Sequence, residues 1–560
     1  DYIFTNTGEM VAIDYSDSTP DVSFTLNRLG QQVTITDGQG TRTFTYNDFL
    51  QLAAETNALA GIQRSYDSQG RSSGFEVWNG GTRSAASGYS YSTVGRFEAL
   101  TSSVPSVLSV EYSYLPNSEL VSGWSNGMVT VSRSYELNRN LLTQVKNMGS
   151  GLISQFDYLN DTLGRRTQRI DSGSAVATNS FGHNPRSELT NALMGANSYA
   201  WNLDNIGNRV ADTSNAVTHS YTVNSLNQYM QITNGGSKML AYDFDGNLTN
   251  DSVFTYSWDG ENRLVGASCS GLVASYKYDY QGRRYQKVVN GETNVFVYDG
   301  WNLVSESNDT ATNVYVWGLD LSGSLQGAGG IGGLLAVTRN GVTYYPCFDA
   351  NGNLTDYVDA GGTNVAHREF DAYGNTVVAT GAMLNDFHFW FSTKYLDSET
   401  GLYYYCRRFY NPSVGRWVSR DPVGSQGGEN LFCFVLNNPV SCADALGEKI
   451  LKMQVHSSGV PHYSDERYRR LSGDKAYWNV AAGDRGGKSE KIAGKKATIP
   501  VRSVTSDWRE TEIQQEQNLG EGIVAAFKFE YQIDRTCYAR VDSDYFAGIP
   551  DPDIGDLEET

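Results

Sequence analysis

Two aspartate-centred turns hold the clearest candidates for chemistry in this sequence. They read Arg420-Asp421-Pro422 and Asp444-Ala445-Leu446-Gly447, and their aspartates lie 23 residues apart. Two carboxylates in close contact can share a proton, so that one activates water while the other protonates a leaving group. If the turns fold back across a short hairpin, Asp421 and Asp444 can act on a peptide bond of their own chain, with Arg420 holding one carboxylate ionised. The structural alternative stays open, because Asp-Pro and Asp-Ala-Leu-Gly are also ordinary turn sequences.

The sequence lacks metal-ligand patterns. Its six Cys and six His form no CxxC pair and no HExxH motif. We therefore expect no structural zinc, no other cofactor and no dense disulfide scaffold. Cys433 and Cys442 can meet across a hairpin, but buried free thiols are the favoured interpretation.

Composition favours strands joined by tight turns. Hydrophobic residues make up 39% and aromatics 12% of the 560 residues, with 36 Tyr and 58 Gly, which is too apolar for a disordered chain and typical of β-structure. The net charge of −19 argues against nucleic acid or anionic lipid as the main partner, because phosphate binding needs a basic face. No apolar run approaches the ~20 residues of a membrane helix, so we expect no transmembrane segment. The chain opens on Asp1 rather than Met, so we interpret it as a processed or excised fragment that says nothing about a signal peptide.

Aromatic residues recur at fixed intervals along the chain. Six of them follow one another at steps of 23 residues, namely Tyr66, Tyr89, Tyr112, Tyr135, Tyr158 and Phe181. Five more follow mostly at steps of 20 or 21, with one step of 16, namely Trp201, Tyr221, Tyr242, Trp258 and Tyr278. Such self-similarity predicts a repeat architecture in which each unit is one hairpin and successive units stack side by side. Stacking is expected to place the aromatics in one ladder.

Several of these aromatics precede an Asp-x-x-Gly-Arg or Asp-x-x-Gly-Asn tail. Examples are YDSQGR at 66–71, YDYQGR at 278–283 and FDANGN at 348–353. The Asp side chain binds nearby backbone and Gly adopts a positive φ, so the tail predicts a tight turn. We interpret the Tyr, Asp, Gly and Arg of these sets as structural.

These units resemble the YD repeats of Rhs proteins, Tc-toxin C components and the teneurin shell. The resemblance covers about residues 60–447. It implies an all-β fold in which hairpins wind as a spiral sheet into a hollow shell, with residues 61–390 as the YD-repeat part. Residues 1–60 are expected to be degenerate repeats or the start of the shell.

Residues 391–447 are similar to the Rhs repeat-associated core domain. The matching elements are YLDSETGLYY at 395–404, RFYNP at 408–412, GRW at 415–417, RDPVG at 420–424, NNP at 437–439 and DALG at 444–447. The resemblance implies that this segment plugs the shell and acts as an intramolecular aspartyl protease, with Asp421, Asp444 and Arg420 at its site. It places the cut at Gly447–Lys449, most simply after Glu448. Ala445 and Glu448 depart from the Pro and Leu of the family pattern, so a member that no longer cuts is the alternative.

Residues 448–560 are predicted to form a separate, variable module of α+β or disordered character. Charged residues account for 36 of its 113 positions, about 32%, against about 15% before it. The leading hypothesis is a secreted or surface-delivered toxin shell with its own C-terminal segment as cargo and, if needed, a shell-closing or delivery partner. A non-cleaving cell-surface adhesion or contact protein is the first alternative, and a carbohydrate-active enzyme is the second.

Overall fold

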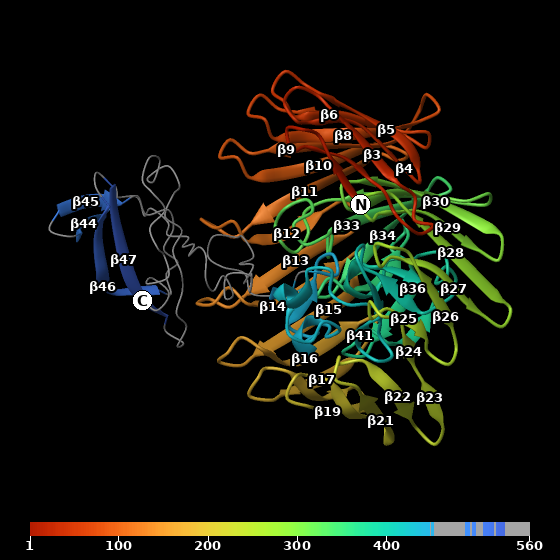
Figure 1. Ribbon diagram of the computed structural model, residues 1–560. Helices are drawn as coiled ribbons and strands as arrows, with labels where there is room; N and C mark the ends of the chain where they lie inside the picture. Colours follow the sequence, from red (N-terminus) through yellow and green to blue (C-terminus); the bar gives the residue numbers. More distant parts are fainter. Residues whose placement is uncertain (449, 453–487, 493–494, 500–507, 520–521, 532–560) are drawn as a thin grey trace. The chain divides into compact units, whose positions relative to one another are not determined.

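The computed structural model describes residues 1–448, 450–452, 488–492, 495–499, 508–519 and 522–531. By contacts the chain divides into two compact units, Asp1–Ser464 and Asp465–Thr560. Regular structure in the described residues is almost entirely strand (Figure 1), which confirms the all-β expectation. The described part of the second unit forms two antiparallel hairpins, β44 (Lys488–Ile492) with β45 (Lys495–Ile499) and β46 (Trp508–Leu519) with β47 (Gly522–Tyr531).

The first unit begins with one 23-stranded antiparallel sheet in which each strand pairs with the next along the chain. Its strands are β1 (Tyr2–Phe4), β2 (Met10–Ile13), β3 (Val22–Leu26), β4 (Gln32–Asp37), β5 (Gly40–Tyr46), β6 (Leu52–Thr56), β7 (Gly61–Tyr66), β8 (Ser72–Asn79), β9 (Thr82–Tyr91), β10 (Phe97–Val104), β11 (Leu108–Tyr114), β12 (Val121–Ser125), β13 (Thr130–Tyr135), β14 (Leu142–Met148), β15 (Leu152–Asn160), β16 (Arg166–Gly173), β17 (Ala177–His183), β18 (Leu189–Met194), β19 (Asn197–Leu203), β20 (Arg209–Ser214), β21 (Val217–Val223), β22 (Tyr229–Thr233) and β23 (Ser237–Met239).

A second sheet of 14 strands continues the series in chain order (Figure 1). Its strands are β24 (Ala241–Tyr242), β25 (Leu248–Asn250), β26 (Thr255–Trp258), β27 (Leu264–Cys269), β28 (Leu272–Tyr278), β29 (Arg284–Val289), β30 (Glu292–Asp299), β31 (Asn302–Ser307), β32 (Thr312–Trp317), β33 (Leu334–Arg339), β34 (Val342–Phe348), β35 (Leu354–Val358), β36 (Asn364–Phe370) and β37 (Thr376–Thr380). Alternation along the strands buries one face, as in β3, where Val22 and Phe24 are buried between exposed Ser23 and Thr25.

One turn geometry recurs along both sheets. In the turn at 67–71, the Asp67 N–H donates to the Arg71 carbonyl at 2.9 Å and the Gly70 N–H donates to the Asp67 carbonyl at 3.0 Å. Asp67 Oδ1 accepts the N–H groups of Gln69 and Arg71, both at 2.9 Å, while its Oδ2 accepts Arg71 Nε at 2.7 Å. Gly70 has a φ of +80°, which glycine adopts without steric cost. The same two backbone bonds close turns that begin at Asn27, Asn47, Ser92, Asp161, Asn184, Asp204, Asn224, Asp243, Asp259, Asp279, Asp349 and Asp371.

The aromatic residue directly before a turn joins its hairpin to the preceding one. The hydroxyl of Tyr66 donates to the Leu52 carbonyl at 2.8 Å, and that of Tyr135 donates to the Val121 carbonyl at 2.7 Å. Tyr46, Tyr91, Tyr114 and Tyr278 make the same bond to the strand that follows the previous turn, and Trp258 and Trp317 make it through the indole N–H.

The expectation of a single aromatic ladder needs correction. Tyr89 and Tyr112, which fall on the 23-residue spacing, stand two residues before Tyr91 and Tyr114, and it is the latter pair that makes the joining bonds. Residues two apart on a strand share a face. The 23-residue spacing therefore took members of two adjacent rows of aromatics on that face and treated them as one row. Tyr89 and Tyr112 contribute ring contacts to Phe97, with centroids 5.7 and 5.3 Å apart.

The two sheets meet along a seam, a line of contacts that runs in the same sequence order along both sheets. Contacts join Tyr15 to Glu261, Arg42 to Asp279, Arg64 to Asp299, Tyr112 to Leu319, Asn147 to Phe348, Tyr158 to Ala350 and Ser174 to Asp356, with a sequence separation of 246 at the first contact and 182 at the last. Hairpin turns of the first sheet therefore pack on the Asp turns of the second, as expected for a wound ribbon. At one such contact Asp37 accepts the Tyr280 N–H at 2.8 Å, and Arg42 lies 2.7 Å from Asp37 and 3.1 Å from Asp279.

Residues 391–448 pack against both sheets (Figure 1). Together with residues 450–452 they contain the 3₁₀ turns η1 (Phe391–Thr393), η2 (Gly424–Gly427) and η3 (Val435–Asn437), a four-stranded sheet and a final hairpin. The sheet consists of β38 (Tyr395–Asp397), β39 (Leu402–Tyr404), β40 (Phe409–Asn411) and β41 (Arg416–Trp417), and the hairpin of β42 (Cys442–Asp444) and β43 (Ile450–Lys452).

A buried ion pair fixes this segment to the second sheet. Arg284 of β29 lies 2.6 Å from Asp397 of β38, and their side chains are 1% and 0% exposed. The Arg284 guanidinium also lies 4.6–5.9 Å from the ring centroids of Tyr276, Phe296, Tyr395, Tyr404 and Phe409. Ion pair and rings together compensate the cost of burying the charge.

We predict that Arg284→Ala lowers the free energy of unfolding by about 3 kcal/mol, the lower end of the range for breaking a buried ion pair, because Lys287, 2.9 Å from Asp397, remains as the partner of the buried carboxylate. Urea unfolding followed by tryptophan fluorescence measures this. Arg83→Ala is the matched control, since its ion pair with Glu76 is 39% and 37% exposed and is expected to contribute less than about 1 kcal/mol. Equal midpoint shifts for the two variants would contradict the role given to Arg284.

Candidate active site

The structure brings Asp421 and Asp444 to the same guanidinium group. Asp421 follows β41 and Asp444 ends β42, and both side chains are buried, at 7% and 1% exposure. Nη2 of Arg408 lies 2.8 Å from Asp421 Oδ2 and 3.7 Å from Asp444 Oδ2. The two carboxylates singled out in the sequence are therefore neighbours across one cation.

Arg408 is the central residue of this site, and the sequence interpretation gave it no role. It lies directly before β40, is 3% exposed, and stacks on Trp417 with its Cζ 4.1 Å from the ring centroid. Its Nη1 donates to the Leu431 carbonyl at 3.2 Å, and its Nε donates to the carbonyl of Gly447. The one sequence signal for Arg408 was that it belongs to the RFYNP element at 408–412. Sequence spacing does not indicate which arginine of this segment reaches the two carboxylates.

Burial raises the pKa of Asp421 to about 6. Arg408 and the Val423 N–H oppose this shift by stabilising the ionised form, whereas the negative charges of Asp444 and Glu448 add to it. Glu448 itself lies 3.7 Å from Arg407 with 29% of its side chain exposed. A carboxyl group with a pKa near 6 exchanges its proton close to physiological pH.

Asp444 organises the turn that contains the expected cut. Its Oδ1 accepts the N–H groups of Leu446, Gly447 and Glu448 at 3.2, 2.8 and 3.1 Å. Gly447 has a φ of +83°, the left-handed conformation that favours glycine. The chain then enters β43, whose Ile450 pairs with Asp444.

The carbonyl groups of this turn are also held. Lys394 Nζ donates to the Ala445 carbonyl at 2.6 Å and to the Gly329 carbonyl at 2.8 Å, and the Arg407 N–H donates to the Leu446 carbonyl at 3.0 Å. The glycine-rich loop at 327–333 forms one wall, where a Cβ at Gly329 would overlap the Ala445 carbonyl oxygen. The turn is thus fixed from both sides.

Arg420 lies elsewhere. Its side chain packs on Gly246, where a Cβ would come within 3.1 Å of Arg420 Cδ. Arg408 occupies the place beside the carboxylates for which the sequence suggested Arg420. Lys449, the last residue of the expected cleavage segment, lies outside the described residues.

The described contacts converge on the Gly447–Glu448 peptide bond. Arg408 binds its carbonyl oxygen and Asp444 accepts the hydrogen of its nitrogen. A cation at the carbonyl oxygen stabilises the oxyanion formed when water attacks. The arrangement has the parts needed for peptide hydrolysis, namely two carboxyl groups, an oxyanion partner and a fixed bond.

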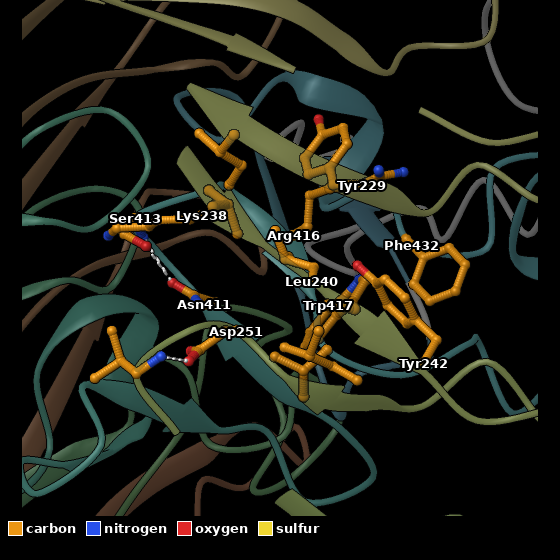
Figure 2. Close-up of a pocket in the computed structure, with 15 residues that line it drawn as sticks. Tyr229, Lys238, Leu240, Tyr242, Asp251, Asn411, Ser413, Arg416, Trp417 and Phe432 are labelled. Atoms are coloured by element: carbon orange, nitrogen blue, oxygen red, sulfur yellow. Dashed lines mark hydrogen bonds between the residues drawn. The ribbon is translucent and has the colours of Figure 1, made fainter. Parts of the chain in front are cut away.

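Figure 2 shows a cavity of about 70 Å³ near this site, at the junction of the two sheets. Tyr229, Lys238, Tyr242, Arg416 and Trp417 are among its walls. The Arg416 guanidinium is already engaged, 4.2 Å from the Tyr229 centroid and 2.7 Å from the Asn430 Oδ1. The lining brings no two carboxylates together, so we assign the cavity to the packing of the sheet junction.

Across the part of the chain that the structure describes, His, Cys, Asp and Glu form no group of three or more that could hold a metal ion. In that same part no helix is long and apolar enough to cross a membrane. Cys433 is half-buried and Cys442 is buried, and the two are not joined by a disulfide.

Comparison with known proteins decides the family. The family model described as "Teneurin YD-shell" matches residues 108–427, more than half of the chain. The chain belongs to this family. The match confirms the resemblance to YD-repeat shells that the aromatic and Asp-Gly sets predicted.

Relatives of the YD-shell chain include proteins named as toxins and nucleases. The tRNA3(Ser)-specific nuclease WapA of Bacillus spizizenii is 33% identical over 260 residues, which cover 44% of this chain and 11% of that protein. Double-stranded DNA deaminase toxin A of Burkholderia cenocepacia is 30% identical over 237 residues, covering 37% and 16%. Toxin subunit YenC1 of Yersinia entomophaga is 41% identical over 93 residues, covering 16% and 9%. This chain thus corresponds to a small part of each relative.

Solved structures agree with the fold of the YD-shell. The crystal structure of TcdB2-TccC3-Cdc42 superposes with a TM-score of 0.53 at 15% identity, covering 79% of this chain and 28% of that one. At this identity the likeness concerns the fold alone. It confirms the β-shell architecture expected from the repeats.

We predict that Gly329→Ala destabilises the YD-shell by about 1–3 kcal/mol more than Gly341→Ala, because the added methyl group displaces the Ala445 carbonyl. Both glycines have positive φ values, +60° and +85°, but Gly341 faces open space. The pair therefore separates the steric clash from backbone strain, which the two sites share. Thermal unfolding of both variants measures the difference, and equal effects would contradict the proposed wall.

Proposed function

We propose that this YD-shell chain belongs to a secreted toxin-delivery protein that encloses its own C-terminal segment and releases it by a single intramolecular cleavage at Gly447–Lys449. The observation that carries the proposal is that Asp421 and Asp444 both lie beside Arg408. Nε of the same arginine donates to the carbonyl of Gly447, at the expected cut. The toxin names of the relatives support delivery as the context.

The proposed chemistry is aspartyl hydrolysis. One carboxyl group carries a proton and the other is ionised. Water gives a proton to the ionised carboxylate, and its oxygen adds to the carbonyl carbon of the peptide bond. The protonated carboxyl group donates its proton to the carbonyl oxygen. The C–N bond then breaks and a proton passes to the leaving nitrogen, so the net change is consumption of one water molecule.

The described residues suggest individual roles for this reaction. Asp421, with its pKa of about 6, is the carboxyl group that carries the proton, and Asp444 is the partner next to the leaving nitrogen. Arg408 stabilises the oxyanion. Because the bond belongs to the same chain and is held in place, proximity makes a slow site sufficient for one turnover.

A non-cleaving shell used for surface contact is the second candidate. Ala445 and Glu448 favour it, since they replace the Pro and Leu of the resemblance at the turn itself. In that case Asp421, Asp444 and Arg408 serve to close the plug. The cleavage experiment separates the two functions.

We predict that the purified chain, denatured and run on a gel, yields a fragment of about 113 residues, the length from Glu448 to Thr560. Asp421→Asn is expected to abolish the fragment, because the isosteric amide cannot exchange the proton. Asp245→Asn, at an exposed turn position, is the matched control and is expected to cleave as the parent does. N-terminal sequencing of the fragment distinguishes a cut after Gly447 from one after Glu448. Full-length chain alone would overturn the cleavage proposal in favour of the non-cleaving shell.

The pKa of Asp421, about 6, sets the expected pH dependence of the cleavage rate. If Asp421 acts as the acid, the rate is maximal below pH 6 and falls up to about tenfold per pH unit as pH rises above 6, because the protonated fraction falls in that proportion. A time course of newly synthesised chain at pH 5 to 8 measures this. A rate that increases as pH rises through 6 would assign Asp421 the role of base instead.

A further inference from the structure

The residues that follow the candidate bond are built into the first unit as a strand. β43 pairs antiparallel with β42, with Ile450 opposite Asp444, Leu451 opposite Ala443 and Lys452 opposite Cys442. The bond to be cut is therefore flanked on both sides by one hairpin. Backbone pairing fixes the register of the downstream segment relative to Asp444.

Leu451 anchors this strand. It is 4% exposed and lies in a cluster with Ala328, Ile331, Ala443 and Ala445, bordered by Leu321 and Leu446. Three of the four buried neighbours are alanines, so the cluster leaves room for one branched side chain. The surrounding pocket combines β42 with the glycine-rich loop at 327–333.

The wall that receives Leu451 also positions the bond. Ala328 and Ile331 of the loop belong to the same buried cluster as Leu451, while Gly329 between them abuts the Ala445 carbonyl. Lys394 then links the carbonyls of Gly329 and Ala445. Because interiors are close-packed, loss of the Leu451 side chain shifts the same loop that fixes the turn.

We infer that Ile450–Lys452 is a recognition strand for self-cleavage, and that Leu451 is its specificity-determining side chain. This inference rests on the proposed function. It extends the requirement for cleavage to the released side of the bond and defines the substrate as a β-strand with an apolar residue of about leucine's volume three positions after Glu448.

The test follows the full chain during cell-free synthesis. After a pulse of labelled methionine, cleavage rates are compared for the parent, Leu451→Ala and Leu451→Met. We expect Leu451→Ala to cleave at least about tenfold more slowly, because small displacements of a reacting bond are costly, and Leu451→Met to stay close to the parent because it conserves volume. Leu137→Ala is the matched control, since Leu137 is 95% exposed.

A second measurement reports strand docking without relying on cleavage. Brief trypsin digestion of the Lys452–Met453 bond is expected to be slow when β43 is paired and faster in Leu451→Ala, because docked segments resist proteolysis. Cleavage of Leu451→Ala at the parental rate would overturn the inference. If the parent itself never cleaves, the proposed function fails. In that case, loss of trypsin protection in Leu451→Ala but not in Leu137→Ala retains the docking strand, and equal protection removes it.

Discussion

The first unit depends on one contact that is repeated along the chain, a side-chain oxygen that accepts two backbone N–H groups of its own turn. At Asp67 this contact occupies Oδ1 and leaves Oδ2 for the arginine four residues later. Isolated hairpins are marginally stable in water, so the closed turn stabilises the fold mainly through the neighbouring groups that it positions. It places the preceding aromatic so that its hydroxyl reaches the previous hairpin, and it forms the edge on which the other sheet packs.

The two candidate catalytic aspartates use variants of this arrangement, with one and three accepted N–H groups instead of two. Asp421 Oδ1 accepts the Val423 N–H, and Asp444 Oδ1 accepts three N–H groups. In both, Oδ2 faces Arg408, a residue distant in sequence, instead of the fifth residue of the turn. Turn formation and chemistry are therefore compatible roles for one side chain. A small change in where the second oxygen points is enough to convert a structural aspartate into a paired, buried carboxyl group.

Local patterns in the sequence predicted the repeats and the turns, because each turn is decided by five neighbouring residues. The aromatic spacing was less informative, since positions two apart share a face and Tyr89 and Tyr91 satisfy the pattern equally well. At the site, Asp421 and Asp444 could be found from turn motifs. Arg408 could not, because its side chain is selected by tertiary packing on Trp417, and adjacency in sequence pointed to Arg420 instead. The anchoring of Leu451 likewise arises from a loop more than 100 residues away.

The seam between the sheets has a geometric consequence. The number of residues between facing contacts decreases from 246 near Tyr15 to 182 near Ser174. The ribbon therefore returns to a facing contact after a chain length that differs by tens of residues between the two ends of this seam. Inserting or deleting a single hairpin between two facing contacts would misalign every later contact, so such a wall can tolerate variation in its turns far more readily than variation in its number of units.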